Sequence, residues 1–303
     1  MVYQQRQENF GDAVKRFFRK PSVLPRLILL NLLVFLIVYV VNLILWLFKA
    51  VDPESLNIFA GWLAVPSEPA RLIQKPWTIF TYMFLHVGAL HLLFNMWMLY
   101  FGGLLFLRYL SDRQLLATYI FGGLSGALVY ILSYNFFPVF LQANPYAIAL
   151  GASASVLAIV VAIAAWVPNF PVNLLFIGSV RIKYIALALI IIDFFSIQGS
   201  NPGGHLAHIG GAAWGLTYAW LMRRGYDPSV IFNLGWLFKR KIRFKSYPAE
   251  KKSRPETDEQ YNRRRAEEQK AIDLILDKIA RSGYDSLSSR EKEILFKSSN
   301  KRN

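Results

Sequence analysis

The sequence predicts an all-α membrane protein, with six transmembrane helices in one bundle and a small helical appendage at the C-terminal end. The composition is 54% hydrophobic and only 17% charged. Residues 114–180 contain no Asp, Glu, Lys or Arg, whereas basic residues gather toward both ends of a chain whose net charge is +15. Such long uncharged stretches are typical of membrane spans. The basic ends predict contact with the lipid bilayer, and with anionic lipids in particular, rather than with nucleic acid.

Apolar runs that end at charged residues define the expected spans. The first is residues 27–48, between Arg26 and Lys49, and it is long enough to cross the hydrocarbon core. The second starts near His86 and ends at Arg108. The remaining spans are expected at residues 115–134, 147–166, 185–192 with an extension backwards, and 205–222.

An even number of spans places both termini on one side of the membrane. Basic residues flank those termini, so the positive-inside rule places them in the cytoplasm, while the uncharged link at 135–146 lies outside. We therefore expect a multi-pass integral protein, in a bacterial cell membrane, with both termini cytoplasmic.

Four segments are expected along the chain. Residues 1–26 form a basic N-terminal segment, in which an amphipathic surface helix and an ordinary charged leader are equally good interpretations. Residues 27–224 form the membrane domain, residues 225–256 a basic linker, and residues 257–303 a small helical cytoplasmic appendage.

The appendage shows helix signals of its own. Its apolar residues at helical spacing are Ile272, Ile275, Leu276 and Ile279. Gly283 is a plausible stop for that helix, and Ser288 with Glu291 fits a capping box that opens a second one. Nothing in the appendage predicts catalysis, and its cytoplasmic partner is unknown.

Polar groups inside the apolar runs point to a function. All four histidines lie in two clusters, His86 with His91 and His205 with His208, on either side of a small-residue stretch that contains Ser153. Polar groups in lipid are costly, and they commonly mark functional sites. The chain has no cysteine, which excludes disulfides and thiolate metal sites, and we expect neither a metal nor a cofactor.

The three clusters are expected to meet in the outer half of the bilayer. They lie on the second, fourth and sixth spans, which all run inward. At ~1.5 Å per helical residue, Ser153, His208 and His91 would lie ~8–9 Å deep and Asn95 ~14 Å deep. His91 and Asn95 share one helix face, and the small residues Gly211 and Gly215 on the face of His208 allow a neighbouring helix to approach closely.

These groups predict a serine peptidase. A serine hydroxyl becomes nucleophilic when a neutral imidazole takes its proton, which gives Ser153 and His208 the catalytic roles. The developing oxyanion needs donors, and Asn95, His91 and the backbone N–H of Ser153 are suitable.

At this point the residues resemble the rhomboid family of intramembrane serine proteases. The resemblance covers residues 25–225 and rests on three motifs: His86-Val-Gly-Ala-Leu-His91-Leu-Leu-Phe-Asn95, Gly151-Ala-Ser153, and Ala207-His208-Ile-Gly-Gly211 followed by Gly215. It implies a Ser153–His208 dyad without a third acid, and an oxyanion site that uses Asn95 and His91. His86, Gly151, His205, Gly211 and Gly215 would line or pack the site. The implied reaction is cleavage of transmembrane protein substrates near the outer surface.

Some residues depart from the family pattern. Ala154 follows the nucleophile where the family commonly has glycine, and Leu157 stands where many members have an aromatic residue. Phe106 and Arg108 take the places of the Glu and Arg that often follow the second span's glycines. None of these changes removes a catalytic group.

Other interpretations compete with this one. Ser155 is the competing nucleophile, although the motif register favours Ser153. Asp193 is expected to cap a span at the outer edge rather than to complete a triad with His208. The rival functions are a catalytically silent binder of transmembrane helices, a zinc site built from histidines, and a transporter. The zinc site is disfavoured because the His-Glu-x-x-His motif is absent.

Overall fold

The structure is a computed structural model that describes residues 9–49, 59–175, 177–232 and 258–300. The chain divides into two compact units, residues 1–238 and 239–303. Most of the expected linker at 225–256 lies outside the described residues. Helices of the first unit are α1 Phe10–Arg19, α2 Val23–Leu47, α3 Ala60–Leu63, α4 Pro69–Gln74, α5 Thr78–Thr81, α6 Ala89–Phe106, α7 Asp112–Phe136, α8 Ser153–Trp166, α9 Ile182–Ser196 and α10 Pro202–Arg223, with 3₁₀ turns η1 Tyr82–Phe84, η2 Pro138–Phe140 and η3 Pro228–Phe232.

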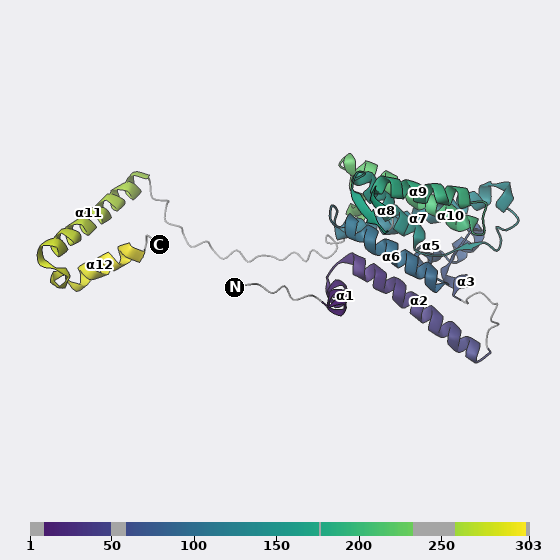
Figure 1. Ribbon diagram of the computed structural model, residues 1–303, viewed down its shortest axis with the longest axis horizontal. Coiled ribbons are helices and arrows are strands. Elements are labelled where there is room, and N and C mark those ends of the chain that lie inside the picture. The colour runs from purple at the N-terminus through teal and green to yellow at the C-terminus, as the bar shows by residue number, and fades with distance from the viewer. Residues whose placement is uncertain (1–8, 50–58, 176, 233–257, 301–303) are drawn as a thin grey trace. The chain divides into compact units, whose positions relative to one another are not determined.

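The first unit is a helical bundle in which α10 packs most extensively against α7 and α8 (Figure 1). Glycines on α10 make this packing possible, because a Cβ at Gly210 would come within 2.5 Å of the Ser125 carbonyl oxygen on α7. A Cβ at Gly215 would come within 2.6 Å of the Ala158 carbonyl oxygen on α8. Backbones that approach this closely exclude larger side chains, as small-residue contacts between membrane helices do.

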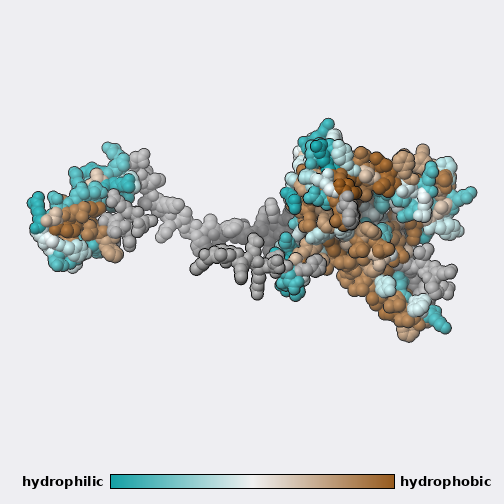
Figure 2. Space-filling view, viewed as in Figure 1, coloured by the Kyte–Doolittle hydropathy of each residue, from teal (hydrophilic) through white to brown (hydrophobic). Residues whose placement is uncertain are grey.

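Hydrophobic residues cover much of the visible surface of this unit (Figure 2). On α2, for example, Leu33, Leu36 and Leu47 are more than half exposed. In the part of the chain that the structure describes, α2, α6 and α7 are long and apolar enough to cross a membrane, and α8 is a shorter apolar helix. Exposed apolar faces of this length fit a lipid environment.

One expected span begins later than the sequence predicted. The fourth was expected from Ala147, but α8 begins at Ser153. Residues Ile148–Ala149 form instead a short strand, β2, which pairs antiparallel with β1, Val65–Pro66. The expectation that residues 147–152 are helical was therefore wrong, so the helical rise does not apply to them and the depth of Ser153 stays a prediction. A second hairpin, β3 Pro171–Leu174 with β4 Gly178–Arg181, occupies the expected loop before α9.

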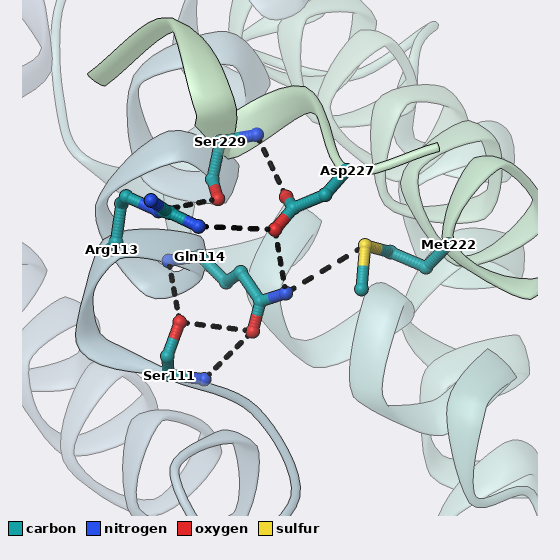
Figure 3. A network of polar contacts seen from close by, with 6 residues as sticks. All are labelled: Ser111, Arg113, Gln114, Met222, Asp227 and Ser229. Atoms are coloured by element: carbon teal, nitrogen blue, oxygen red, sulfur yellow. Dashed lines mark hydrogen bonds and ion pairs between the residues drawn. The ribbon is translucent and has the colours of Figure 1, made fainter. Parts of the chain in front are cut away.

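A polar network joins the start of α7 to the chain that follows α10 (Figure 3). Ser111 and Gln114 form a capping box at the α7 N-terminus. The Gln114 side chain then donates to Asp227 at 3.0 Å, and Arg113 contacts both Asp227 and Ser229. Burial disfavours ionisation of Asp227, but hydrogen bonds from Ser229 and Gln114 and the charge of Arg113 outweigh it and lower the pKa of Asp227 below its ordinary value.

The second unit is a helical hairpin of α11, Asp258–Ser282, and α12, Ser289–Asn300, with a 3₁₀ turn, η5 Tyr284–Ser286, between them. The expected stop is confirmed, because α11 ends immediately before Gly283, whose φ is +77°. The expected capping box is also present: the Ser288 N–H donates to Glu291 at 2.7 Å, and the Glu291 N–H donates to the Ser288 hydroxyl. Lys278 on α11 bonds to Glu291 and ties the two helices together.

Candidate active site

Ser153 is the first residue of α8, directly after a sharp backbone turn. Gly151 has φ +122°, a conformation that favours glycine, and its N–H donates to the Tyr82 carbonyl at 2.9 Å. This turn ends the β2 segment and directs the chain into α8. Ser153 is partly exposed, and it lies at a helix N-terminus, where the first backbone N–H groups have no partner within the helix.

The competing serine lies in a different environment. Ser155 is 1% exposed, and its hydroxyl oxygen would be only 2.7 Å from a Cβ at Gly123 on α7. That oxygen has no hydrogen-bond partner among the described residues. Ser155 thus packs as a small residue at the α7–α8 contact, and it is Ser153 whose side chain a substrate could reach.

Helices α8 and α10 touch beside Ser153. A Cβ at Gly211, one turn after His208, would fall on the carbonyl oxygen of Ala154. From α7, a Cβ at Gly126 would lie 2.6 Å from Ala154 Cβ and 2.9 Å from the Ala207 carbonyl oxygen. The residues next to Ser153 and His208 therefore share one contact point. In the part of the chain that the structure describes, no hydrogen bond joins the Ser153 hydroxyl to His208.

The packing also explains one departure from the family pattern. Ala154 is 2% exposed, and its methyl group occupies the space that glycine leaves at position 126. Leu157, the other departure near the nucleophile, is 7% exposed and belongs to the bundle core.

The structure brings Asp193 to the two histidines of α10. One carboxylate oxygen, Oδ1, lies 2.7 Å from His208 Nδ1 and 2.8 Å from His205 Nδ1. Asp193 lies inside α9, and it is 8% exposed. The expectation that it would cap a span was wrong, because its side chain faces α10 and bonds imidazole. The sequence identified Asp193 as a polar residue in an apolar segment, but it could not predict which way the side chain points. The residues next to Asp193 are all apolar, so no pattern distinguishes the buried face of this helix.

These three residues are a group that could hold a metal ion, because their potential ligand atoms lie within 4.8 Å of one another. Two imidazoles and a carboxylate are donors that suit Zn²⁺. In the structure the same atoms satisfy one another by hydrogen bonds.

His91 lies next to the turn that precedes Ser153. A Cβ at Gly151 would lie 2.8 Å from His91 Cε1 and 3.7 Å from Ser153 Oγ, so all three residues adjoin one small space. The imidazole of His91 is therefore available beside the N-terminus of α8.

His86 and Asn95 support this wall of the site. His86 is fully buried, its ring centroid lies 5.2 Å from that of His91, and its Nε2 accepts a 3.4 Å hydrogen bond from the Ala152 N–H. Asn95 is 6% exposed and donates from Nδ2 to the His91 carbonyl at 2.9 Å. A side-chain amide has two N–H donors, so, among the residues that the structure describes, one remains for another acceptor.

Taken together, the fold and the site define a polytopic helical membrane protein that gathers a serine, an amide and imidazoles inside an apolar bundle. The chain belongs to the rhomboid family: residues 74–225, half of the chain, match the family model of the rhomboid domain. Members of that family are integral membrane proteins and typically intramembrane serine proteases that act on transmembrane substrates. A second match, over residues 256–301, is to a family of unknown function, DUF6576.

Curated relatives agree with the family. The chain is 32% identical over 90 residues to the rhomboid protease GlpG of Salmonella newport and, with the same figures, to that of Salmonella heidelberg. The matched region is 24% of this chain and 32% of each relative. The chain therefore spans about a third of the length of these relatives.

Proposed function

We propose that this protein is a serine endopeptidase that hydrolyses peptide bonds of transmembrane-anchored substrates near the outer membrane face through a Ser153–His208 dyad. The observation that carries the proposal is the contact of α8 with α10 at Gly211 and Ala154, one turn from His208 and one residue from Ser153. In this mechanism His208 takes the proton of the Ser153 hydroxyl, the oxygen attacks the scissile carbonyl, and the imidazolium then protonates the leaving amine.

The oxyanion of the tetrahedral intermediate would be stabilised by donors on α6 and at the start of α8. Its donors are the free amide N–H of Asn95, the His91 imidazole and the backbone N–H groups at the start of α8. Donors held in place before the reaction act most strongly in a site that excludes bulk water. His86, Gly151, His205, Gly211 and Gly215 would shape this space without taking part in bond making.

Cleavage of a transmembrane reporter by the purified full-length protein in liposomes tests the reaction. We expect Ser153→Ala and His208→Ala to lower the rate by about 10³-fold or more, and Ser155→Ala, the matched control, to leave it unchanged. A metal chelator should have no effect. Cleavage that survives Ser153→Ala but stops with chelator would replace this proposal with a metal site. A wild-type protein that binds transmembrane peptides without cleaving them would favour the catalytically silent alternative.

The proposal includes six spans, with both termini in the cytoplasm of a bacterial cell and anionic lipid against the basic flanks. The chain has no cysteine, so single cysteines report topology without background. A membrane-impermeant thiol reagent added to intact cells should label Gln142→Cys, in the link before β2. It should label Ser282→Cys, at the end of α11, only after permeabilisation. The reverse pattern would overturn this topology.

A further inference from the structure

A single carboxylate serves both histidines of α10. His205 and His208 are three residues apart, so they share one face of the helix, and Asp193 approaches that face from α9. Its Oδ1 accepts from both Nδ1 atoms, at 2.8 Å and 2.7 Å. The neighbours of Asp193 on α9, Ile192 and Phe194, are both about 60% exposed, so the acid is the one residue of this stretch turned inward.

Burial of a carboxylate within an apolar helix is costly unless hydrogen-bond donors or positive charges lie next to it. The two imidazole N–H groups meet that need. The arrangement also fixes the chemistry of His208, because a proton held on Nδ1 leaves Nε2 unprotonated. Nε2 is the nitrogen that must take the proton from Ser153.

We propose that Asp193 is a positioning residue of the catalytic histidine, so that this chain operates an Asp193–His208–Ser153 triad. This inference rests on the proposed function. Asp193 holds the Nδ1–H tautomer of His208, keeps the ring aimed across the α8–α10 contact, and stabilises the imidazolium that forms when Ser153 attacks. The family dyad has no acid in this role.

His205 has a different part in the same arrangement. Its Nδ1 donates to the same Asp193 oxygen that accepts from His208, and so it anchors the carboxylate. An asparagine at 205 would keep an N–H donor near the position of Nδ1, whereas alanine would remove it. His205→Asn should therefore retain most of the activity. His205→Ala should lower the activity, although the other residues of the site are unchanged.

The test uses the full-length protein in liposomes and compares wild type with Asp193→Asn. The matched control is Asp227→Asn, which changes a carboxylate that follows α10 and bonds to the start of α7. We expect Asp193→Asn to lower kcat by about 10²–10⁴-fold with KM and the melting temperature little changed. Asp227→Asn should leave kcat unchanged. A wild-type kcat in Asp193→Asn would overturn the proposal. A lower kcat accompanied by a matching decrease in melting temperature would also overturn it, because the loss would then reflect unfolding.

A spectroscopic measurement separates this proposal from the proposed function. The chain has only four histidines, so ¹⁵N-histidine labelling gives few signals, which single variants assign. We expect His208 to carry its proton on Nδ1 in wild type and to change tautomer in Asp193→Asn. An unchanged tautomer would refute the positioning role even if Ser153 proves catalytic. If wild type cleaves nothing, the proposed function fails, and the tautomer measurement still decides whether Asp193 sets the state of His208.

Discussion

The two ends of the α7–α10 pair handle their polar groups in opposite ways. Where α7 begins and α10 ends, Ser111, Gln114 and Asp227 bond to one another and to Arg113 and Ser229 (Figure 3). Where α10 begins, hydrogen bonds fix the side chains of the proposed site but do not involve the atoms proposed to react. Among the residues that the structure describes, His208 is held through Nδ1 only, and Ser153, at the start of the neighbouring helix α8, is partly exposed.

This difference distinguishes hydrogen bonds that stabilise the fold from hydrogen bonds that position catalytic groups. A network that is fully satisfied fixes helices in place and has no capacity left for a substrate. An active site must instead fix each catalytic side chain through one polar atom and leave another donor or acceptor of that side chain free for the substrate. Asn95 does so through its bond to the His91 carbonyl, and His208 does so through Asp193. Substitutions at the two ends should therefore separate effects on rate from effects on stability.

After Ser153, His208 and Asp193, the largest effect on rate alone is expected at Asn95. Asn95→Ala removes the proposed oxyanion donor and should lower kcat by about 10²–10³-fold with little change in melting temperature. The matched control is Asn135→Ala, because Asn135 makes the same type of bond to the carbonyl four residues before it. Equal losses in the two variants, or a normal kcat in Asn95→Ala, would contradict the role in the oxyanion site.

Gly211→Ala should affect stability and activity together. The added methyl group would fall on the Ala154 carbonyl oxygen, so α8 and α10 must separate, at a cost of about 1–3 kcal/mol. The melting temperature in detergent and the rate of reporter cleavage should both decrease. Ala213→Val adds bulk at an exposed position of the same helix and serves as the control. A Gly211→Ala protein with wild-type melting would show that the contact tolerates expansion.

At the opposite end the effect should fall on stability alone. Gln114→Ala removes donors to Asp227 and half of the capping box, and we expect a loss of about 1–2 kcal/mol with kcat unchanged. Thr118→Ala, which removes only a hydroxyl bonded to the carbonyl of residue 114, is the milder control. A fall in kcat at full stability would mean that this network communicates with the site.

The sequence predicted the long apolar helices well where apolar runs lie next to charged residues, as for α2 and α7. It failed at the start of α8, because Ile148–Ala149 is held extended by pairing with Val65–Pro66, far away in the chain. No local pattern encodes that pairing. The motifs identified the residues around Ser153, but the partner of His208 depended on which face of α9 turns inward. Apolar residues surround Asp193 on both sides, so periodicity could not show that face.

The smallest effect is expected in the appendage, where the polar contacts are exposed. Hydrogen bonds from Lys278 and from Ser288 lower the pKa of Glu291 to about 2 from an ordinary value of 4.5. Because the folded-state pKa is the lower one, this stabilisation is complete above about pH 4.5 and is lost as the pH falls toward 2. Exposure to solvent keeps it small.

Amide exchange of α11 and α12 in the intact protein, referenced to intrinsic rates at each pH, should show protection that decreases over this range. Glu291→Gln should show weaker protection at neutral pH and no such decrease. Equal pH dependence in both proteins would mean that the helical hairpin is held by its apolar contacts and not by the Lys278–Glu291 bond.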